Sequence, residues 1–251
     1  MGKSNTAERL AEAVREEKYR ILSGSALKMI AMISMLIDHT AAFLLIKADF
    51  MNEPLFPALS KQLTLYKIFR ILGRFAFPIF CFLVTEGFIH THDRKKYGIN
   101  LLVFALISEI PWNLVHSGRL LYTSQNVFFT LLLGFAALWA YDLFKEDMPK
   151  LGAVFLFLFV SSLLLRSDYG SKGMAFILIL YIMRENKILQ AFIGSCVLSS
   201  AALVMASFVP INMYNGERGF IKGKAAKYAF YAFYPLHLLV LYLIRRAVYG
   251  V

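Results

Sequence analysis

An aspartate and a histidine lie side by side within one long apolar segment of the chain. The segment, residues 27–46, reads LKMIAMISMLIDHTAAFLLI, and Asp38 and His39 lie close to its middle. An ionisable group at that depth of a membrane costs about 2.5 kcal/mol or more, so such groups pair with others and mark functional sites. The pair is therefore the first candidate for a functional site. The alternative is a structural histidine that is hydrogen-bonded to Asp38.

A lysine precedes this pair on the same predicted helix. Lys28 lies eleven residues before His39, which is almost three helical turns and places the two side chains on one face. They would be about 16 Å apart along the helix axis. This spacing suits a site where an anionic cofactor is held at the membrane surface and delivers a group inward. For Lys28 the alternative is an ammonium group that reaches the lipid headgroups.

Arginine and glutamate occur within the next two apolar segments. Arg70, Arg74 and Pro78 recur every four residues and should line one helix face. Two arginines in an apolar helix need carboxylate or phosphate partners. Glu109, four residues before Asn113, is the natural counter-ion of Arg74 or a neighbour of His39. An ion pair and a functional role are equal alternatives for Glu109.

The remaining polar candidates are spread over the second half of the chain. His237 lies within the final apolar segment, and a second histidine at that depth favours a site that handles protons or acyl groups. Asn126 opens an apolar segment, and Asp168 lies in the joint SDYGSKG, where a turn or cap role is the alternative to chemistry. The residues interpreted as interfacial are His90, His92, His116, Tyr228, Tyr231 and Tyr234. No spacing indicates a metal site.

The composition indicates the kind of fold that must position these residues. Hydrophobic residues make up 59% of the chain and charged residues 17%, whereas soluble domains carry about 25% charged residues. We predict an all-α fold, a polytopic integral membrane helix bundle with about eight transmembrane helices. The expected spans are residues 27–46, 66–89, 98–116, 126–143, 151–166, 172–183, 188–208 and 226–246. Residues 1–22 are expected to form an amphipathic surface helix, and residues 23–251 a single transmembrane domain.

The charge pattern bears on partners and topology. The net charge of +11 does not indicate nucleic acid, because lysine and arginine lie mostly at the ends of apolar runs, where they anchor to headgroups. Their distribution favours both termini on the cytoplasmic side. The joint MYNGERGFIKGKAAK is too basic for an ordinary outer loop. It should fold back into the protein, or the topology near it is miscounted.

Several blocks of this sequence resemble the TraX family of bacterial inner-membrane proteins. The blocks are LKMIAMISMLIDH, GRFAFPIFCFLVTEGF, EIPWN, NVFFTLLLG, DYGSKG, YNGERG and KYAFYAFYPLHLL. TraX itself is associated with N-terminal acetylation of F-type pilin. More distantly, the chain is similar to acyltransferase family 3, whose first helix carries a basic residue and then a histidine three turns later. Lys28 and His39 match that layout, with lysine in place of the usual arginine, and Arg70, Arg74 and Pro78 resemble the arginine pair before a proline in a later helix.

The resemblance implies an acetyltransferase that uses cytoplasmic acetyl-CoA. His39 would be the general base or acetyl carrier, oriented by Asp38, and His237 would complete the acceptor side. Lys28 and the basic joints would hold the coenzyme A phosphates, with Arg70, Asn113 and Asn126 as further cofactor residues. Arg74, held by Glu109 and aided by Asn113 or Asn126, would stabilise the oxyanion.

The resemblance leaves the acceptor and the assembly state open. The chain has fewer spans than the larger relatives and lacks their periplasmic domain. A pilin or other peptide amine and a glycan hydroxyl therefore both remain as acceptors, and a homo-oligomer in the membrane lipid also remains open. Two other classes fit the polar residues, namely a proton-coupled transporter and a membrane scaffold of a conjugation or secretion system.

Overall fold

The computed structural model describes residues 18–56, 60–198 and 200–250. Within these residues the chain is helical except for one small antiparallel hairpin and the connecting joints. The predicted all-α membrane fold is confirmed. The expected surface helix over residues 1–22 lies largely outside the described residues, which begin at residue 18.

The helices and strands follow one another in a single bundle. The first half holds α2 (Gly24–His39), η1 (Thr40–Leu44), η2 (Leu45–Lys47), α3 (Asp49–Asn52), β1 (Pro54–Phe56), β2 (Ser60–Thr64), α4 (Leu65–Gly73), α5 (Ala76–His90) and α6 (Arg94–Ser117). The second half holds α7 (Val127–Phe144), α8 (Met148–Leu165), α9 (Gly170–Ile182), α10 (Lys187–Val197), α11 (Ala201–Asn212) and α12 (Lys224–Tyr249).

The number of helices that can cross a membrane differs from the expected eight. In the described part of the chain, six helical stretches are long and apolar enough, and α9, α10 and α11 are shorter apolar helices. The segment expected as one span over residues 188–208 is two helices. The backbone is extended at Leu198, and α11 begins after Ser200, so the chain turns back within this segment.

The basic joint before α12 folds back onto the beginning of α2, which is one of the two expected outcomes. Gly24 N–H donates to Glu217 O at 2.8 Å, and Ser25 N–H donates to Arg218 O at 3.0 Å. Gly219 allows this approach, since a Cβ there would lie 2.2 Å from Ser23 Oγ and its φ is +82°. We call this the Lys28 end of the bundle, because α2 and α12 both begin here.

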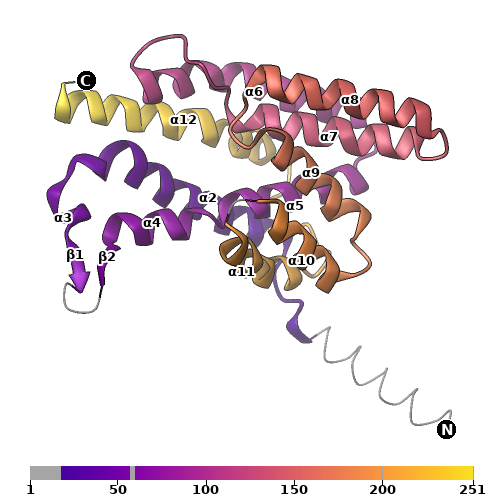
Figure 1. Cartoon of the computed structure of the whole chain (residues 1–251), viewed down its shortest axis with the longest axis horizontal. Helices are drawn as coiled ribbons and strands as arrows, with labels where there is room; N and C mark the ends of the chain where they lie inside the picture. Colours follow the sequence, from indigo (N-terminus) through magenta and orange to yellow (C-terminus); the bar gives the residue numbers. More distant parts are fainter. Residues whose placement is uncertain (1–17, 57–59, 199, 251) are drawn as a thin grey trace, which may run out of the picture.

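The other end of the bundle carries the end of α12. Arg245 Nη1 near the end of α12 donates to Val115 O near the end of α6, at 3.0 Å. The small β1–β2 hairpin lies at this end too, and we call it the hairpin end (Figure 1). Residue 22 and residue 249 therefore lie at opposite ends. The expectation that both termini face the cytoplasm stays a prediction.

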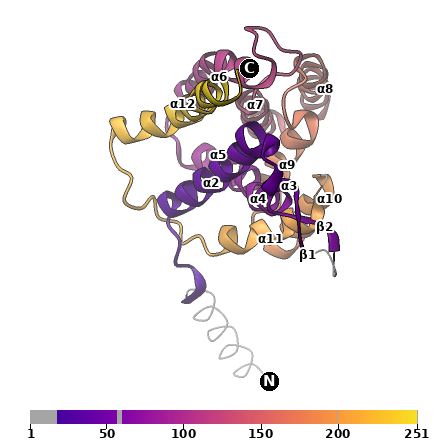
Figure 2. The same cartoon turned by 90° about the vertical axis from the view of Figure 1, so that its left-hand side faces the viewer.

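The helices stack in layers around a common core. Figures 1 and 2 show α6, α7, α8 and α12 on one side, α2, α4 and α5 in the middle, and α10 and α11 on the other side. The core between them includes the fully buried side chains of Leu27, Phe88, Phe135, Phe176 and Leu238. The middle layer therefore faces helices on both sides, and it carries Asp38, His39 and Arg70.

Two of the middle helices are irregular where the polar residues lie. After His39 the α2 helix continues through a π-helical turn, Thr40–Leu44, and such turns are frequent at functional sites. The predicted span 66–89 is broken between α4 and α5 at Arg74 and Phe75. Pro78 then occupies the first turn of α5, where its missing N–H leaves no bond unmade.

Candidate functional site

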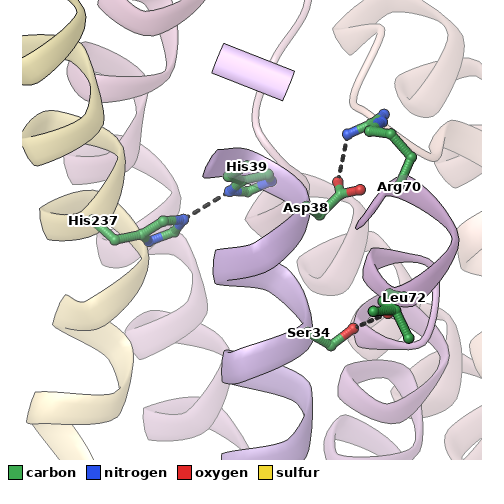
Figure 3. A network of polar contacts seen from close by, with 6 residues as sticks. All are labelled: Ser34, Asp38, His39, Arg70, Leu72 and His237. Carbon is green, nitrogen blue, oxygen red and sulfur yellow. Dashed lines mark hydrogen bonds and ion pairs between the residues drawn. The ribbon is translucent and has the colours of Figure 1, made fainter. Parts of the chain in front are cut away.

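Asp38 and His39 point to different neighbours, as Figure 3 shows. Asp38 Oδ2 accepts a hydrogen bond from Arg70 Nη1 of α4 at 2.7 Å. His39 Nδ1 lies 2.7 Å from His237 Nε2 of α12. The expected contact between Asp38 and the His39 ring is wrong, because consecutive residues of a helix point about 100° apart.

Asp38 and Ser34 form one face of α2 that is joined to α4. The two residues are four apart, so they lie above one another on the helix. Ser34 Oγ donates to Leu72 O at 2.5 Å, and Leu72 lies next to the helix break. The other oxygen of Asp38, Oδ1, is buried and has no hydrogen-bond partner among the described residues. The contacts of Ser34 and Asp38 fix the position of α4 along α2. One oxygen of the Asp38 carboxylate remains without a hydrogen-bond partner in the described part of the chain.

Gly73 is the residue that allows Asp38 to come so close. A Cβ at position 73 would lie 2.2 Å from Asp38 Cβ and Oδ1. We expect Gly73→Ala to push α4 from α2 and to lower the free energy of unfolding by about 1–3 kcal/mol, the usual cost of overpacking. Thermal unfolding in detergent measures the effect. Gly152→Ala in α8 is the matched control, since no described heavy atom lies within 4 Å of its Cβ; equal melting of the two variants would contradict this packing.

A cavity of about 500 Å³ adjoins this group of residues, and we call it cavity 1. Asp38, His39, Arg70, Arg74 and Pro78 all line it. Arg70, Arg74 and Pro78 were expected on one face of a single helix; they lie on α4, the joint and α5, and all three line cavity 1. Cavity 1 is the one place in the described chain where His39 meets both arginines.

His116 also lines cavity 1, although it was expected at the membrane interface. Its Nδ1 lies 2.9 Å from Trp112 O, one turn earlier in α6. The ring of Phe43 contacts both histidines, with centroids 4.8 Å from His116 and 5.4 Å from His39. His116 was expected at the interface because it lies at the end of a helix. The end of α6 lies beside the π-helical turn that follows His39, and this brings His116 to cavity 1.

Asp168 is the second carboxylate of cavity 1. Its N–H donates to Gln125 O at 3.1 Å, while its side chain is exposed to the cavity. Desolvation by the cavity walls raises the pKa of the Asp168 carboxyl to about 6, and the Arg74 guanidinium acts in the opposite direction. Asp168 is thus more than a turn residue, since it lines the same cavity as His39 and Arg74.

Glu109 and Asn126 form a separate structural group. Asn126 N–H donates to Glu109 Oε1 at 3.0 Å, and the Asn126 amide donates to Glu109 and to Ala105 O. Asn126 Oδ1 accepts from Phe128 N–H and caps α7. The predicted contact of Glu109 with Arg74 is wrong, because Asn126 occupies the carboxylate. Asn126 is fully buried and has no donor left for an oxyanion or a cofactor.

Asn113 and Arg74 also differ from expectation. The Asn113 amide donates to Leu120 O at 2.8 Å, and Asn113 is absent from the residues that line the described cavities. Arg74 has no ion pair within 4.0 Å among the described residues. Its guanidinium is therefore free to bind a negative group in cavity 1, but without help from either asparagine.

A second cavity of about 550 Å³, cavity 2, lies at the Lys28 end. Lys28, Arg218 and Lys227 line it together with Glu86 and His90, which form a local pair at 3.4 Å. The rest of the wall is largely apolar and aromatic, and includes Leu83, Phe128, Phe230, Tyr231 and Phe233. Cavity 2 thus combines a basic part with an apolar part.

The two cavities adjoin. The residues that line both are Met35, Phe80, Val127, Leu131 and Tyr234. Tyr234 was expected in an interfacial aromatic belt, but it is 4% exposed, and its hydroxyl lacks a hydrogen-bond partner within the described residues. Lys28 and His39 therefore lie in neighbouring cavities that share a mostly apolar wall. No group of three or more metal-binding side chains occurs in the described residues.

Known proteins resemble this chain along most of its length. The family described as "TraX protein" matches residues 23–245. The "Probable fimbrial assembly protein FimC, serogroup H1" of Dichelobacter nodosus is 29% identical over 248 residues, which cover 87% of this chain and 94% of that protein. No solved structure matches the chain.

Proposed function

The chain belongs to the TraX family, and from that premise we propose that it is an acetyltransferase of the bacterial inner membrane. It would move an acetyl group from cytoplasmic acetyl-CoA to an acceptor at the membrane. The acceptor would be the N-terminus of a pilin or other peptide, or a glycan hydroxyl. The name of the relative, a fimbrial assembly protein, supports a link to pili, and also favours a scaffold as the second candidate.

One observation carries this proposal, namely the two adjoining cavities. Cavity 2 offers Lys28, Arg218 and Lys227 to the phosphates of coenzyme A and apolar walls to its thioester arm. Cavity 1 offers His39. Since the cavities share part of their walls, a thioester held in cavity 2 would reach His39 by movement of the shared side chains.

The transfer itself would use the groups of cavity 1. His39 would take the proton from the acceptor amine or hydroxyl while that atom attacks the thioester carbonyl. Arg74 would stabilise the negative charge on the carbonyl oxygen. The carbon–sulfur bond then breaks, the new amide or ester remains on the acceptor, and the proton on His39 passes to the departing sulfur.

The direction of the protein in the membrane follows from its basic residues. Those at the Lys28 end include Lys28, Arg94, Lys95, Lys96, Lys145, Lys150, Arg184, Lys187, Arg218, Lys222, Lys224 and Lys227. Those at the hairpin end include Lys47, Lys67, Arg119, Arg166, Arg245 and Arg246. Basic residues favour the cytoplasmic side, so we place the Lys28 end, and with it cavity 2, in contact with cytoplasmic acetyl-CoA.

The test is binding and turnover of radiolabelled acetyl-CoA by the purified full chain in detergent. We expect saturable binding and slow release of free coenzyme A without an acceptor. Absence of binding by monodisperse protein would contradict the proposal. Proton flux in liposomes would then support a transporter, and failed pilus assembly with normal chemistry would support a scaffold.

Lys28 gives a sharper form of this test. We expect Lys28→Ala to raise the Kd for acetyl-CoA about tenfold, because a hydrogen bond to a charged group contributes about 1.5–3 kcal/mol. Lys28→Arg should retain most of the affinity. Lys145→Ala is the control, since Lys145 lies at the same end but outside cavity 2. Equal affinities of the alanine variants would remove Lys28 from the cofactor site.

A further inference from the structure

The geometry points to His237 as a positioning residue that sets which nitrogen of His39 is basic. Figure 3 shows the His237 ring directed at His39 and away from Asp38 and Arg70. His237 was expected to act on the acceptor. It is 7% exposed and is absent from the described residues that line cavities 1 and 2, and its Nε2 lies against His39 Nδ1. The catalytic consequence rests on the proposed function, whereas the tautomer itself does not.

The hydrogen bonds of the two histidines determine which ring nitrogen of each carries the proton. His237 Nδ1 lies 2.8 Å from Phe233 O, and a carbonyl oxygen can only accept, so Nδ1 carries the proton of His237. In a neutral ring its Nε2 is then an acceptor. His39 Nδ1, 2.7 Å away, must donate to it. The tautomer of a histidine is set by the hydrogen bond of its other nitrogen, so the lone pair of His39 is on Nε2.

Packing holds this pair of rings in place. His237 stacks on Phe233 at 4.9 Å between centroids with 16° between the planes, and Tyr234 meets it edge-on at 5.6 Å. Phe43 covers His39 at 5.4 Å. In free histidine the neutral ring carries its proton mainly on Nε2, which would leave the basic lone pair of His39 on Nδ1, the nitrogen that faces His237. His237 reverses that preference, and Asp38 cannot, because consecutive residues of a helix point about 100° apart and Asp38 is directed at Arg70.

The direct test is nitrogen NMR of protein labelled with ¹⁵N-histidine in detergent, with the His39 signals assigned by their loss in His39→Gln. We expect His39 to be protonated at Nδ1 and unprotonated at Nε2. In His237→Phe the proton should move to Nε2. In His237→Gln it should stay on Nδ1, because the Gln carbonyl can accept from His39. His92, which is exposed, serves as the internal reference.

Turnover provides the second measurement. We expect His237→Phe to lower kcat at least about 100-fold, as loss of the correct tautomer does in other acyl transfers, with an unchanged KM for acetyl-CoA and recovery in His237→Gln. A wild-type His39 protonated at Nε2, or a tautomer unaffected by His237→Phe, overturns the inference. The NMR measurement needs no substrate. The tautomer of His39 can therefore be confirmed or refuted whether or not the protein transfers acetyl groups.

Discussion

Replacing His39 by alanine should lower acetyl transfer by at least about 100-fold, because a positioned general base contributes about 10²–10⁴-fold. Binding of acetyl-CoA should remain close to that of the wild type, since Lys28, Arg218 and Lys227 line the other cavity. The expected signature is therefore unchanged Kd with lost turnover. Equilibrium binding and single-turnover transfer on the same preparation measure the two quantities.

The control for this variant is His92→Ala, which removes an exposed histidine outside the described cavities and should leave both quantities unchanged. Unaltered elution on size exclusion would show that His39→Ala still folds. Retained turnover in folded His39→Ala would exclude the mechanism, whatever the affinity for acetyl-CoA. Loss of binding together with turnover would instead indicate that the acetyl group reaches His39 in the bound state.

The sequence predicted the class of fold and six of the eight expected membrane spans, because apolar length is a strong signal. It predicted less well where the chain turns inside the membrane. The 188–208 segment is apolar throughout, and only the extended backbone at Leu198 divides it into α10 and α11. Likewise, the sequence of residues 66–89 does not predict that α4 ends before Arg74, since arginine is a good helix former.

The polar residues were also predicted only in part. The sequence singled out Asp38, His39, Arg70 and Arg74, all of which line cavity 1, but it assigned them the wrong partners. Helical geometry could have prevented one error, because residues 38 and 39 cannot share a face. It could not have predicted that α4 would supply Arg70 and α12 His237. Those contacts depend on which helices are neighbours.

His116 and Asp168 were underrated for a related reason. Both lie at helix ends, and apolar length alone places such residues at the membrane surface. In the folded chain the π-helical turn beside His39 brings Phe43 against His116, and the joint before α9 brings Asp168 into cavity 1. The Trp112–His116 spacing of four residues was a usable signal, since it places both side chains on one face.

The ion pair of Asp38 and Arg70 should account for the largest single loss of stability in this region. We expect Asp38→Asn to lower the free energy of unfolding by about 2–4 kcal/mol, near the range of about 3–5 kcal/mol for breaking a fully buried pair. The two side chains are 17% and 29% exposed, which places the value toward the lower end. The cause is an Arg70 guanidinium left without its partner in an apolar environment. Reversible unfolding in mixed micelles measures the change.

A double-mutant cycle separates this cause from damage to packing. Asp38→Asn with Arg70→Gln removes both charges at nearly constant volume, so we expect the double variant to recover most of the loss. Asp147→Asn is the matched control, because the Asp147–Lys150 pair lies at an exposed joint, with 38% and 68% exposure, and such pairs contribute little. A double variant as unstable as Asp38→Asn would show that the loss does not come from an unpaired charge on Arg70. Recovery would show that the carboxylate is retained for its charge, beside the histidine that we propose to carry the chemistry.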